Sequence, residues 1–378
     1  DFIMVFGNSL SAGTPTDATV TTAKLADSAV TNAKLSFNAN QLRNIIINGD
    51  MSIAQRGTSV SSVTGTDATC DRWRFTPSSA GTWTISQSTT VPTGQGFATS
   101  FKADCTSANT SLSAGSILRF SQFVEGQNIQ YLKKGTSSAE SLAISFWVRS
   151  AKTGTYILNI KDRDNSRIYS QSYTISAADT WEKKTITYAG DTTGAFDNDN
   201  DWSLEVHFWL AAGSTYTSGT LATAWESNTT ANLAVGQVNL ADSTSNDWYV
   251  TGIQVEVGSA ASDFEFLPFD VNLARCQRYY WRSYADTFYF KAAKDNQRHA
   301  KMTFPVTMRA TPTATYFPTN ADLEAGTNSG NAAKDVGSTT VSTSNVGGDR
   351  NYNTALVSDT TDSNFRVNTK VSVEFFSE

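Results

Sequence analysis

The sequence is short of the residues on which most catalytic and metal sites depend. Only two histidines occur, His207 and His299, so any histidine-dependent catalysis has to use one of them. The three cysteines, Cys70, Cys105 and Cys276, are odd in number and widely spaced, which excludes a complete disulfide framework and a CxxC metal site. We expect three buried free thiols, typical of a protein made in a reducing cytoplasm.

Charged residues and long apolar runs are scarce as well. Charged residues make up 17% of the 378 residues, and the net charge is −6 with both signs interspersed. This distribution lacks the basic patch of a nucleic-acid-binding protein. No apolar run approaches the ~18 residues that a membrane helix needs. We therefore expect no nucleic-acid partner and no membrane insertion.

The sequence is rich in Thr, Ser and aromatic residues, which favour strands over helices. Apolar and polar residues alternate between turns rich in Gly, Ser, Thr and Asp, which is typical of the short antiparallel strands of a sandwich or jelly roll. In three runs the alternation predicts residues that share one face of a strand. These sets are Leu142, Ile144, Phe146 and Val148; Leu204, Val206, Phe208 and Leu210; and Tyr249, Thr251, Ile253, Val255 and Val257.

A repeat near the N-terminus predicts self-association. Val20-Thr21-Thr22-Ala23-Lys24-Leu25 recurs ten residues later as Val30-Thr31-Asn32-Ala33-Lys34-Leu35, so Val20, Leu25, Val30 and Leu35 follow one another every five residues. A single thread cannot bury these anchors, because the residues between them are small or polar. Three chains around a common axis bury them, which predicts a homotrimeric neck. The alternative is a disordered Thr/Ala-rich linker.

The sequence therefore predicts an all-β protein in three parts. Residues 1–42 form the neck, residues 43–267 a jelly-roll β-sandwich, and residues 268–378 a smaller C-terminal β domain. The last part ends on a strict alternation that predicts an ordered strand close to the C-terminus. The residues on one face of that strand are Phe365, Val367, Thr369, Val371, Val373 and Phe375.

Several motifs resemble those of bacteriophage tail fibre proteins, in particular those of phages of marine bacteria. The Val-Thr-x-Ala-Lys-Leu repeats are similar to the necks of such fibres. Other segments resemble a fibre domain and its downstream module. They are Ile47-Asn48-Gly49-Asp50-Met51, Ala54-Gln55-Arg56-Gly57, Asp71-Arg72-Trp73, Thr251-Gly252-Ile253-Gln254-Val255-Glu256-Val257-Gly258, Phe264-Glu265, Cys276-Gln277-Arg278-Tyr279-Tyr280, Phe304-Pro305-Val306-Thr307-Met308-Arg309 and Thr311-Pro312-Thr313.

This resemblance implies a homotrimer and a jelly roll like that of carbohydrate-binding modules. It further implies assembly in the host cytoplasm with other phage tail proteins, and a final location in the tail fibre of the virion. The family has no agreed catalytic residues to transfer to this chain.

Aromatic and polar residues on the outward faces of the predicted strands are the candidate binding residues. An indole ring offers an apolar plane to the C–H face of a sugar, while charged and amide neighbours bond its hydroxyl groups. The candidates are Trp147 and Arg149; His207 and Trp209, beside Glu205; Gln254 and Glu256; and Trp225, which we expect in a loop as the most exposed aromatic residue. The alternative is that the tryptophans pack in a second layer or in a subunit interface.

Carboxylates give two weaker hypotheses. Asp197, Asp199 and Asp201 imitate the opening of a calcium loop, but Trp202 stands where that loop requires Gly, so a solvated acidic hairpin is favoured. Glu205, Glu256, Asp162 and Asp164 offer pairs for glycoside cleavage, as any acidic β protein does. We therefore predict a protein without cofactor or metal that is not an enzyme.

Three functions remain open after the sequence. The first is an adhesin that binds a bacterial surface glycan, with three copies that add avidity. The second is a structural fibre segment without receptor binding. The third is a polysaccharide depolymerase, for which the carboxylate pairs are the candidate residues.

Overall fold

The computed structural model describes residues 42–282, 287–289, 291–292 and 298–310, together with the strands at 354–357, 366–368 and 372–373, and describes side chains in 42–281 and 304–310. The chain divides into two compact units, residues 1–43 and 44–378. The account below concerns the second unit. The predicted neck anchors Val20, Leu25, Val30 and Leu35 lie outside the described residues.

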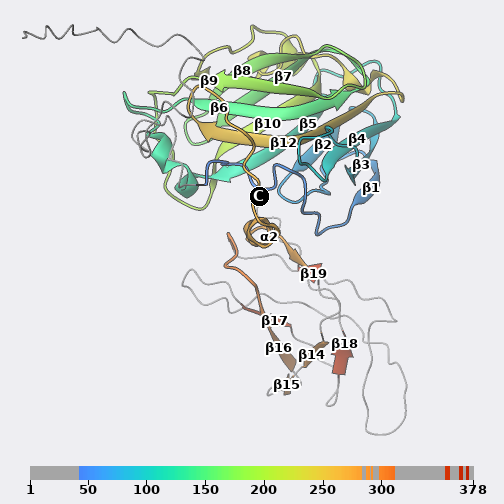
Figure 1. The fold of residues 1–378 in the computed structure, drawn as a ribbon, viewed down its shortest axis with the longest axis vertical. Coiled ribbons are helices and arrows are strands. Elements are labelled where there is room, and N and C mark those ends of the chain that lie inside the picture. The colour runs from blue at the N-terminus through green and yellow to red at the C-terminus, as the bar shows by residue number, and fades with distance from the viewer. Residues whose placement is uncertain are drawn as a thin grey trace, which may run out of the picture. The chain divides into compact units, whose positions relative to one another are not determined.

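Two six-stranded antiparallel sheets packed face to face make up the main body (Figure 1). Sheet A has the order β1-β3-β4-β12-β6-β9. Its strands are β1 Ser59–Val63, β3 Thr82–Ser88, β4 Ser100–Ser107, β12 Asp247–Val257, β6 Leu142–Ser150 and β9 Glu182–Tyr188. Sheet B has the order β11-β8-β7-β10-β5-β2. Its strands are β11 Glu226–Ser227, β8 Arg167–Ile175, β7 Gly154–Asp162, β10 Trp202–Ala212, β5 Ile117–Glu125 and β2 Arg74–Ser78. The predicted jelly-roll β-sandwich is confirmed.

Alternation in β6 and β10 places the predicted apolar residues in the core between the sheets, as the period of two requires. Aromatic rings fill the centre of this core. Phe120 stacks on Trp73 at 4.6 Å and on Phe101 at 4.3 Å between ring centroids, and Trp248 meets Phe120 edge to face at 5.6 Å. Side chains of this size bury large apolar areas, so this cluster stabilises the sandwich.

Strand β12 departs from the predicted alternation. The prediction placed Tyr249 and Thr251 on the same face as Ile253 and Val255, but the pairing register shifts between Thr251 and Gln254. Gly252 adopts a positive φ of 62° at this irregularity. Ile253 and Val255 therefore face the core, whereas Tyr249 lies opposite Lys102 and Arg149 outside it. The prediction of a single face for this run was wrong.

The segment that precedes β1 closes one end of the sandwich. The amide of Ile45 donates to the carbonyl of Val255 in sheet A, and the side chain of Gln122 in sheet B bonds both the amide and the carbonyl of Ile47. A Cβ on Gly49 would lie 2.0 Å from the carbonyl oxygen of Ile253, so only glycine fits there. The Ile-Asn-Gly-Asp-Met motif is thus a structural element that bridges the two sheets.

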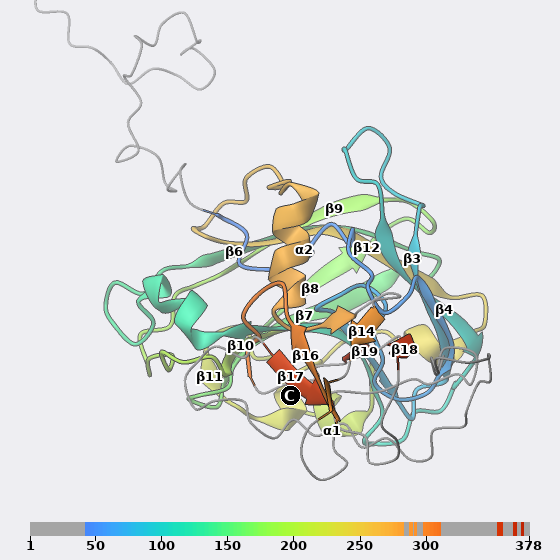
Figure 2. The same cartoon turned by 90° about the horizontal axis from the view of Figure 1, so that it is seen from below.

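A helix that the all-β prediction missed follows the sandwich. Helix α2, Phe269–Gln277, packs against the same N-terminal segment, where Leu273, Cys276 and Tyr279 meet Ile47 and Ile53 (Figure 2). Its short apolar face lies between polar residues, so the sequence gives no long 3.6-residue period to reveal it.

The remaining elements are short. Between the strands lie α1 Ser214–Thr217 and the 3₁₀ turns Gly126–Asn128, Gln130–Leu132, Thr230–Asn232 and Leu240–Asp242. After α2 the described strands form three small antiparallel sheets. They are β13 Trp281–Arg282 with β19 Ser372–Val373; β14 Thr287–Tyr289 with β18 Arg366–Asn368; and β15 Lys291–Ala292, β16 Arg298–Thr303 and β17 Thr354–Val357. The expected C-terminal strand is thus described only as β18 and β19, which belong to different sheets.

Two further expectations concern the described residues. All three cysteines are free and buried, as predicted. Among the helices of the described ranges, none has the length and hydropathy needed to cross a membrane.

Candidate functional site

The outer surface of sheet A carries an aromatic face, which we define as Lys102, Trp147, Arg149, Trp181 and Tyr249. Trp147 and Arg149 extend outward from β6 because Phe146 and Val148 point into the core. Tyr249 stands opposite both Lys102 and Arg149 in the strand pairing. Trp181 lies just before the edge strand β9, with its ring 6.1 Å from that of Tyr249. The fold therefore places three aromatic residues from three segments on the outer side of one sheet, and the rings of Trp181 and Tyr249 are in contact.

Two cations lie beside the ring of Tyr249. The guanidinium carbon of Arg149 lies 4.8 Å from the ring centre of Tyr249, and the ammonium of Lys102 lies 5.6 Å from it. Arg149 is held in place by Asp179, through bonds of 3.0 Å to its carbonyl and 2.8 Å to its carboxylate. Trp147 and Trp181 are both partly exposed. An aromatic plane beside fixed hydrogen-bond donors is the arrangement that recognises a sugar ring and its hydroxyl groups.

The outer surface of sheet B carries a second group of residues, the basic face, which we define as Arg74, Arg119, Phe123, Lys161, Glu205 and His207. The strand pairing sets Glu205 between Phe123 and Lys161. Likewise Ser121 lies between His207 and Arg74. The predicted His207 is therefore placed beside cations that the sequence did not connect with it.

Glu205 and His207 form the centre of the basic face. Nε2 of His207 lies 3.2 Å, and Nζ of Lys161 3.7 Å, from Oε2 of Glu205. Burial favours a raised pKa for Glu205, but the hydrogen bond and charge of His207, with the charges of Lys161 and Arg119, lower that pKa to about 2. Burial and the charge of Arg119 lower the pKa of His207 to about 4. Near neutral pH the pair is a carboxylate beside a neutral imidazole.

Trp209, predicted with His207, lies in a second small core and not on an open surface. Its ring is fully buried by Ala222, Leu233 and Ala234, which belong to the loop that crosses sheet B, and by Tyr216 at 5.3 Å. The alternative interpretation, packing in a second layer, holds for this tryptophan.

Gln254 and Glu256 do lie on one side of β12, but they are buried. Nε2 of Gln254 donates to Oε1 of Glu256 at 2.8 Å, and Ser262 bonds both carboxylate oxygens of Glu256. The side-chain oxygen Oε1 of Gln254 accepts from the backbone amide of Glu265. These two residues fix the segment that leads to α2, so they are not a surface binding pair.

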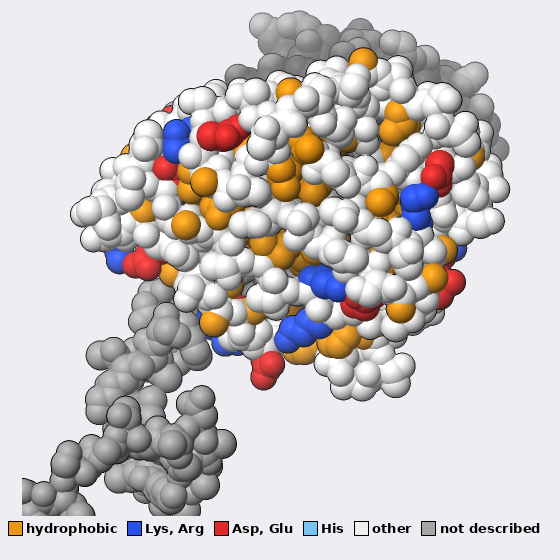
Figure 3. All heavy atoms as spheres, turned by 90° about the horizontal axis from the view of Figure 1, so that it is seen from above, with side chains coloured by type: hydrophobic (Ala, Val, Ile, Leu, Met, Phe, Trp, Pro, Cys, Tyr) orange, Lys and Arg blue, Asp and Glu red, His pale blue; other side chains and the backbone are white. Residues whose placement is uncertain are grey.

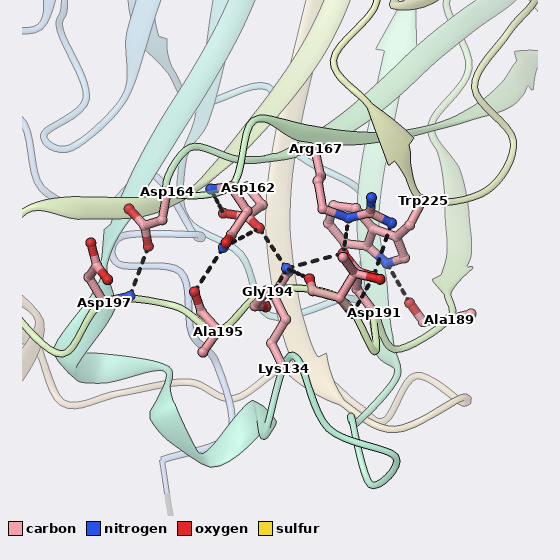
Figure 4. A network of polar contacts seen from close by, with 12 residues as sticks. Lys134, Asp162, Asp164, Arg167, Ala189, Asp191, Gly194, Ala195, Asp197 and Trp225 are labelled. Atoms are coloured by element: carbon pink, nitrogen blue, oxygen red, sulfur yellow. Dashed lines mark hydrogen bonds and ion pairs between the residues drawn. The ribbon is translucent and has the colours of Figure 1, made fainter.

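Trp225 lies in a loop as predicted, but it is not a freely exposed aromatic residue. It is partly buried against the core, its Nε1 donates to the carbonyl of Ala189 at 2.7 Å, and its ring meets that of Tyr169 at 5.9 Å. It borders a buried charge network centred on Lys134 (Figure 4). Trp225 therefore contributes to the fold at this position.

The acidic run does not assemble a cation site. The carboxylate of Asp199 accepts from the amide of Asp201, the carboxylate of Asp201 accepts from the amide of Trp202, and the amide of Asp197 donates to Asp164. Among the side chains that the structure describes, no three His, Cys, Asp or Glu residues are placed to hold a metal ion. The run is a hairpin that bonds its own backbone.

The carboxylates considered for glycoside cleavage do not face one another across one surface. Glu205 extends from sheet B and Glu256 from sheet A. Asp162 is fully buried in an ion pair with Lys134, and Asp164 accepts the amide of Asp197. A pair of carboxylates that flank one glycosidic bond is not formed from these four residues.

On the side shown in Figure 3, most Lys and Arg side chains lie next to an Asp or Glu side chain, and hydrophobic side chains gather between these pairs. Compensated charge of this kind is typical of a solvated surface. On sheet B, Lys161 lies opposite Glu205 in the strand pairing, with its ammonium 3.7 Å from that carboxylate.

Sequence reasoning missed several residues of both faces. Trp181 and Tyr249 belong to the aromatic face, and Arg74, Arg119 and Lys161 to the basic face. Alternation in their own strands gives the outward direction of each, but not which strands are neighbours. Pairing between strands far apart in sequence decides that.

No protein-family model matches the chain, and no curated protein sequence matches it. Solved structures with a similar fold include the enzymatically active domain of bacteriophage CBA120 tailspike protein 4, at 15% identity and a TM-score of 0.30, with 57% of this chain and 21% of that chain covered. A putative sugar binding protein from Bacteroides thetaiotaomicron is 15% identical, with coverage of 57% and 100% and a TM-score of 0.31. A family 11 carbohydrate-binding module from Clostridium thermocellum, solved with a mixed-linked tetrasaccharide, is 13% identical, with coverage of 55% and 98% and a TM-score of 0.25.

Proposed function

We propose that this protein is a component of a bacteriophage tail fibre that binds a glycan on the bacterial surface. In this proposal three copies associate through the N-terminal repeat, other phage tail proteins join the fibre, and the chain acts as an adhesin and not as an enzyme. The motifs of the sequence support the fibre assignment. The aromatic face is the observation that supports glycan binding.

The composition of the aromatic face suits a sugar ligand better than it suits a protein partner. Trp147 and Trp181 present indole rings at the surface, while Arg149 and Lys102 supply donors for hydroxyl groups. Asp179 holds Arg149 in position before any ligand arrives, so little side-chain entropy is lost on binding. A single shallow site of this type binds weakly, and three copies raise the apparent affinity through avidity.

The test is binding of the full chain to an array of bacterial surface polysaccharides, with Trp147→Ala and Trp181→Ala as variants. Loss of a central aromatic residue is expected to weaken binding about tenfold or more. Thr185→Ala is the matched control, because Thr185 is exposed on β9 of the same sheet and carries no aromatic ring. That variant should bind as the original protein does.

The array also separates the alternatives. Binding that survives both tryptophan substitutions in folded protein would reject the aromatic face as the site. No binding to any polysaccharide would favour a structural fibre segment. Release of shortened sugar from the array would favour a depolymerase.

A further inference from the structure

Large apolar side chains are exposed where α2 begins. Phe266 is 51% exposed, Phe269 64% and Val271 38%, and we call these three residues the phenylalanine face. Among the side chains that the structure describes, only two other large apolar residues are exposed, Leu42 and Tyr131. Single exposed apolar residues are common on a protein surface, whereas a group of them often marks a contact surface.

The phenylalanine face is held in one shape by the fold beneath it. The ring of Phe266 lies 4.9 Å from that of Phe264 and 5.1 Å from that of Phe97, which is buried. The amide of Asn272 donates to the carbonyl of Pro268 at 3.1 Å, which fixes the first turn of α2. Little entropy is therefore lost when a partner covers the face.

The chain enters the main body beside this face. The amide of Asn44 donates to the carboxylate of Glu265 at 2.9 Å, and Glu265 directly precedes Phe266. Figure 2 shows α2 next to the N-terminal segment, drawn in blue. Asn44 follows Leu35, the last anchor of the repeat, by nine residues, which span at most roughly 30 Å. Three chains joined through the repeat therefore have their phenylalanine faces close to one axis.

The size of the face selects its partner. A fully covered aromatic side chain buries roughly 150–250 Å², so these partly exposed residues offer roughly 300 Å² per chain. A stable interface between separate proteins buries about 800 Å² on each partner. The face is therefore too small to hold a separate protein. It suits a copy of this chain that the repeat already keeps close, because a linker raises the effective concentration of the second contact.

We propose that the phenylalanine faces of the three copies cover one another, so that the start of α2 forms a second interface of the trimer in addition to the neck. This inference rests on the proposed trimer. One copy alone leaves Phe266 and Phe269 in water, whereas three copies bury these rings against one another near the axis. The neck brings the chains together, and the phenylalanine face fixes the sandwiches to each other.

The experiment measures how fast a thiol reagent modifies Val271→Cys in the full chain. The three native cysteines are buried, so the introduced thiol is the accessible one. In the trimer the reaction is expected to be about tenfold or more slower than in the same variant with Leu25→Asp and Leu35→Asp, which releases the chains. Thr185→Cys is the matched control: Thr185 is exposed on β9, so its thiol should react equally in both states.

Light scattering of the same samples separates this inference from the proposed trimer. A single-chain mass for protein with an intact repeat would overturn both. A trimer in which Val271→Cys reacts as fast as in the released chains would overturn this inference alone. Slow reaction in both states would show that the same chain covers the face, and would also reject the proposal.

A second measurement does not depend on the introduced thiol. The double change Phe266→Ser and Phe269→Ser is expected to raise the concentration at which the trimer dissociates, in a fixed amount of urea, by about tenfold or more, because each face loses both aromatic rings. Circular dichroism checks that the variant keeps its β-sheet signal. Unchanged dissociation of the folded double variant would contradict the proposal.

Discussion

At the scale of single residues, the surroundings of Glu205 and His207 move the pKa of each group away from its usual value. His207 is 2% exposed and Glu205 is 7% exposed, although both point away from the core between the sheets. The ring of Phe123 lies 6.2 Å from that of His207, and the ammonium of Lys161 lies 3.7 Å from the carboxylate of Glu205. The result is a histidine that resists protonation beside a carboxylate that stays ionised.

This pair predicts a specific loss of stability in acid. Unfolded His207 takes up a proton near its usual pKa of 6.5, whereas folded His207 does so at about 4. The unfolded state therefore binds more protons between these values, so the contribution of His207 is complete above pH 6.5 and falls as the pH drops to 4. The contribution of Glu205 falls at lower pH, between 4.5 and about 2.

Replacement of His207 by Gln removes the first of these two losses. Urea unfolding of the original protein should show stability that falls by on the order of 3 kcal/mol between about pH 7 and about pH 4, beyond the fall seen in His207→Gln. Carboxylates away from His207 titrate alike in both proteins, so the difference reports His207 together with its effect on the pKa of Glu205. Parallel curves for the two proteins would show that His207 is not held neutral by the fold.

Gly252 gives a second prediction at the residue scale. It has a φ of 62°, and a Cβ there would lie 2.5 Å from the ring of Phe97. Gly252→Ala combines left-handed backbone strain with a displaced ring, so a loss of about 2–4 kcal/mol in unfolding free energy is expected.

Gly94→Ala is the matched control for this change. Gly94 also has a positive φ, of 75°, but a Cβ there would meet nothing within 4 Å. It should cost only the backbone strain, about 1–2 kcal/mol. Equal losses in the two variants would mean that Phe97 moves aside freely.

At the scale of elements, polar side chains connect the ends of the sandwich to the segments beside them, where no further strand pairs. Arg278, just after α2, forms two bonds of 2.8 and 2.7 Å with the carboxylate of Glu125 on β5, and Tyr279 donates to the same carboxylate. The guanidinium of Arg72 lies over the ring of Tyr279 at 3.4 Å. Arg72 belongs to the segment Asp71-Arg72-Trp73, and Tyr279 belongs to the segment Cys276-Gln277-Arg278-Tyr279-Tyr280. These two segments are far apart in the sequence but are in contact in the structure.

Lys134 joins the C-terminal end of β7 to the loop that follows β9. Its buried ammonium contacts four oxygens: the carboxylates of Asp162 at 2.6 Å and Asp191 at 3.1 Å, and the carbonyls of Thr193 at 2.7 Å and Gly194 at 2.8 Å (Figure 4). Such a cation holds the loops together in the way a bound metal ion would.

Lys134→Met is therefore expected to lower the unfolding free energy by about 3–5 kcal/mol, because it leaves buried carboxylates without their partner. Lys133→Met is the matched control: Lys133 is 54% exposed and pairs with the partly exposed Glu140, so its loss should cost less than about 1 kcal/mol. Adding Asp162→Asn to Lys134→Met should recover part of the loss. Denaturant unfolding of the four proteins measures all of this, and similar midpoints for both lysine variants would contradict it.

At the scale of the whole molecule, the association of chains is the open prediction. The five-residue spacing of Val20, Leu25, Val30 and Leu35 remains outside the described residues. Burial of each anchor is worth roughly 1.5–3 kcal/mol, so four anchors from each of three chains are sufficient to order a neck that one chain cannot bury.

Light scattering coupled to gel filtration should therefore give three times the 40.9 kDa mass of one chain. Changing both Leu25 and Leu35 to Asp should release monomers, while the β-sheet signal of the sandwich in circular dichroism persists. A chain of 40.9 kDa with an intact repeat would reject the trimer. Changing Lys24 and Lys34 to Gln is the control, since neither is an anchor.

The sequence by itself determined the features that depend on local pattern. Alternation placed Phe146 in the core and Trp147 outside it, and placed Phe208 inside and His207 outside, because a strand has a period of two whatever its neighbours are. The same pattern with frequent turns was sufficient for the antiparallel sandwich. The isolated spacing of the cysteines was sufficient for free thiols.

Only the tertiary structure decided what lies above and beside each outward residue. The loop that contains Ala222, Leu233 and Ala234 covers Trp209, while Ala189 and Tyr169 contact Trp225. Neither ring is therefore freely exposed, although neither was predicted to face the core between the sheets. The irregularity at Gly252 shifts the register of β12, so the side chains after it face the side opposite to the one that strict alternation predicts. Strand order brings Phe123 and Lys161 to either side of Glu205. These outcomes depend on contacts between residues far apart in sequence, which a local period does not encode.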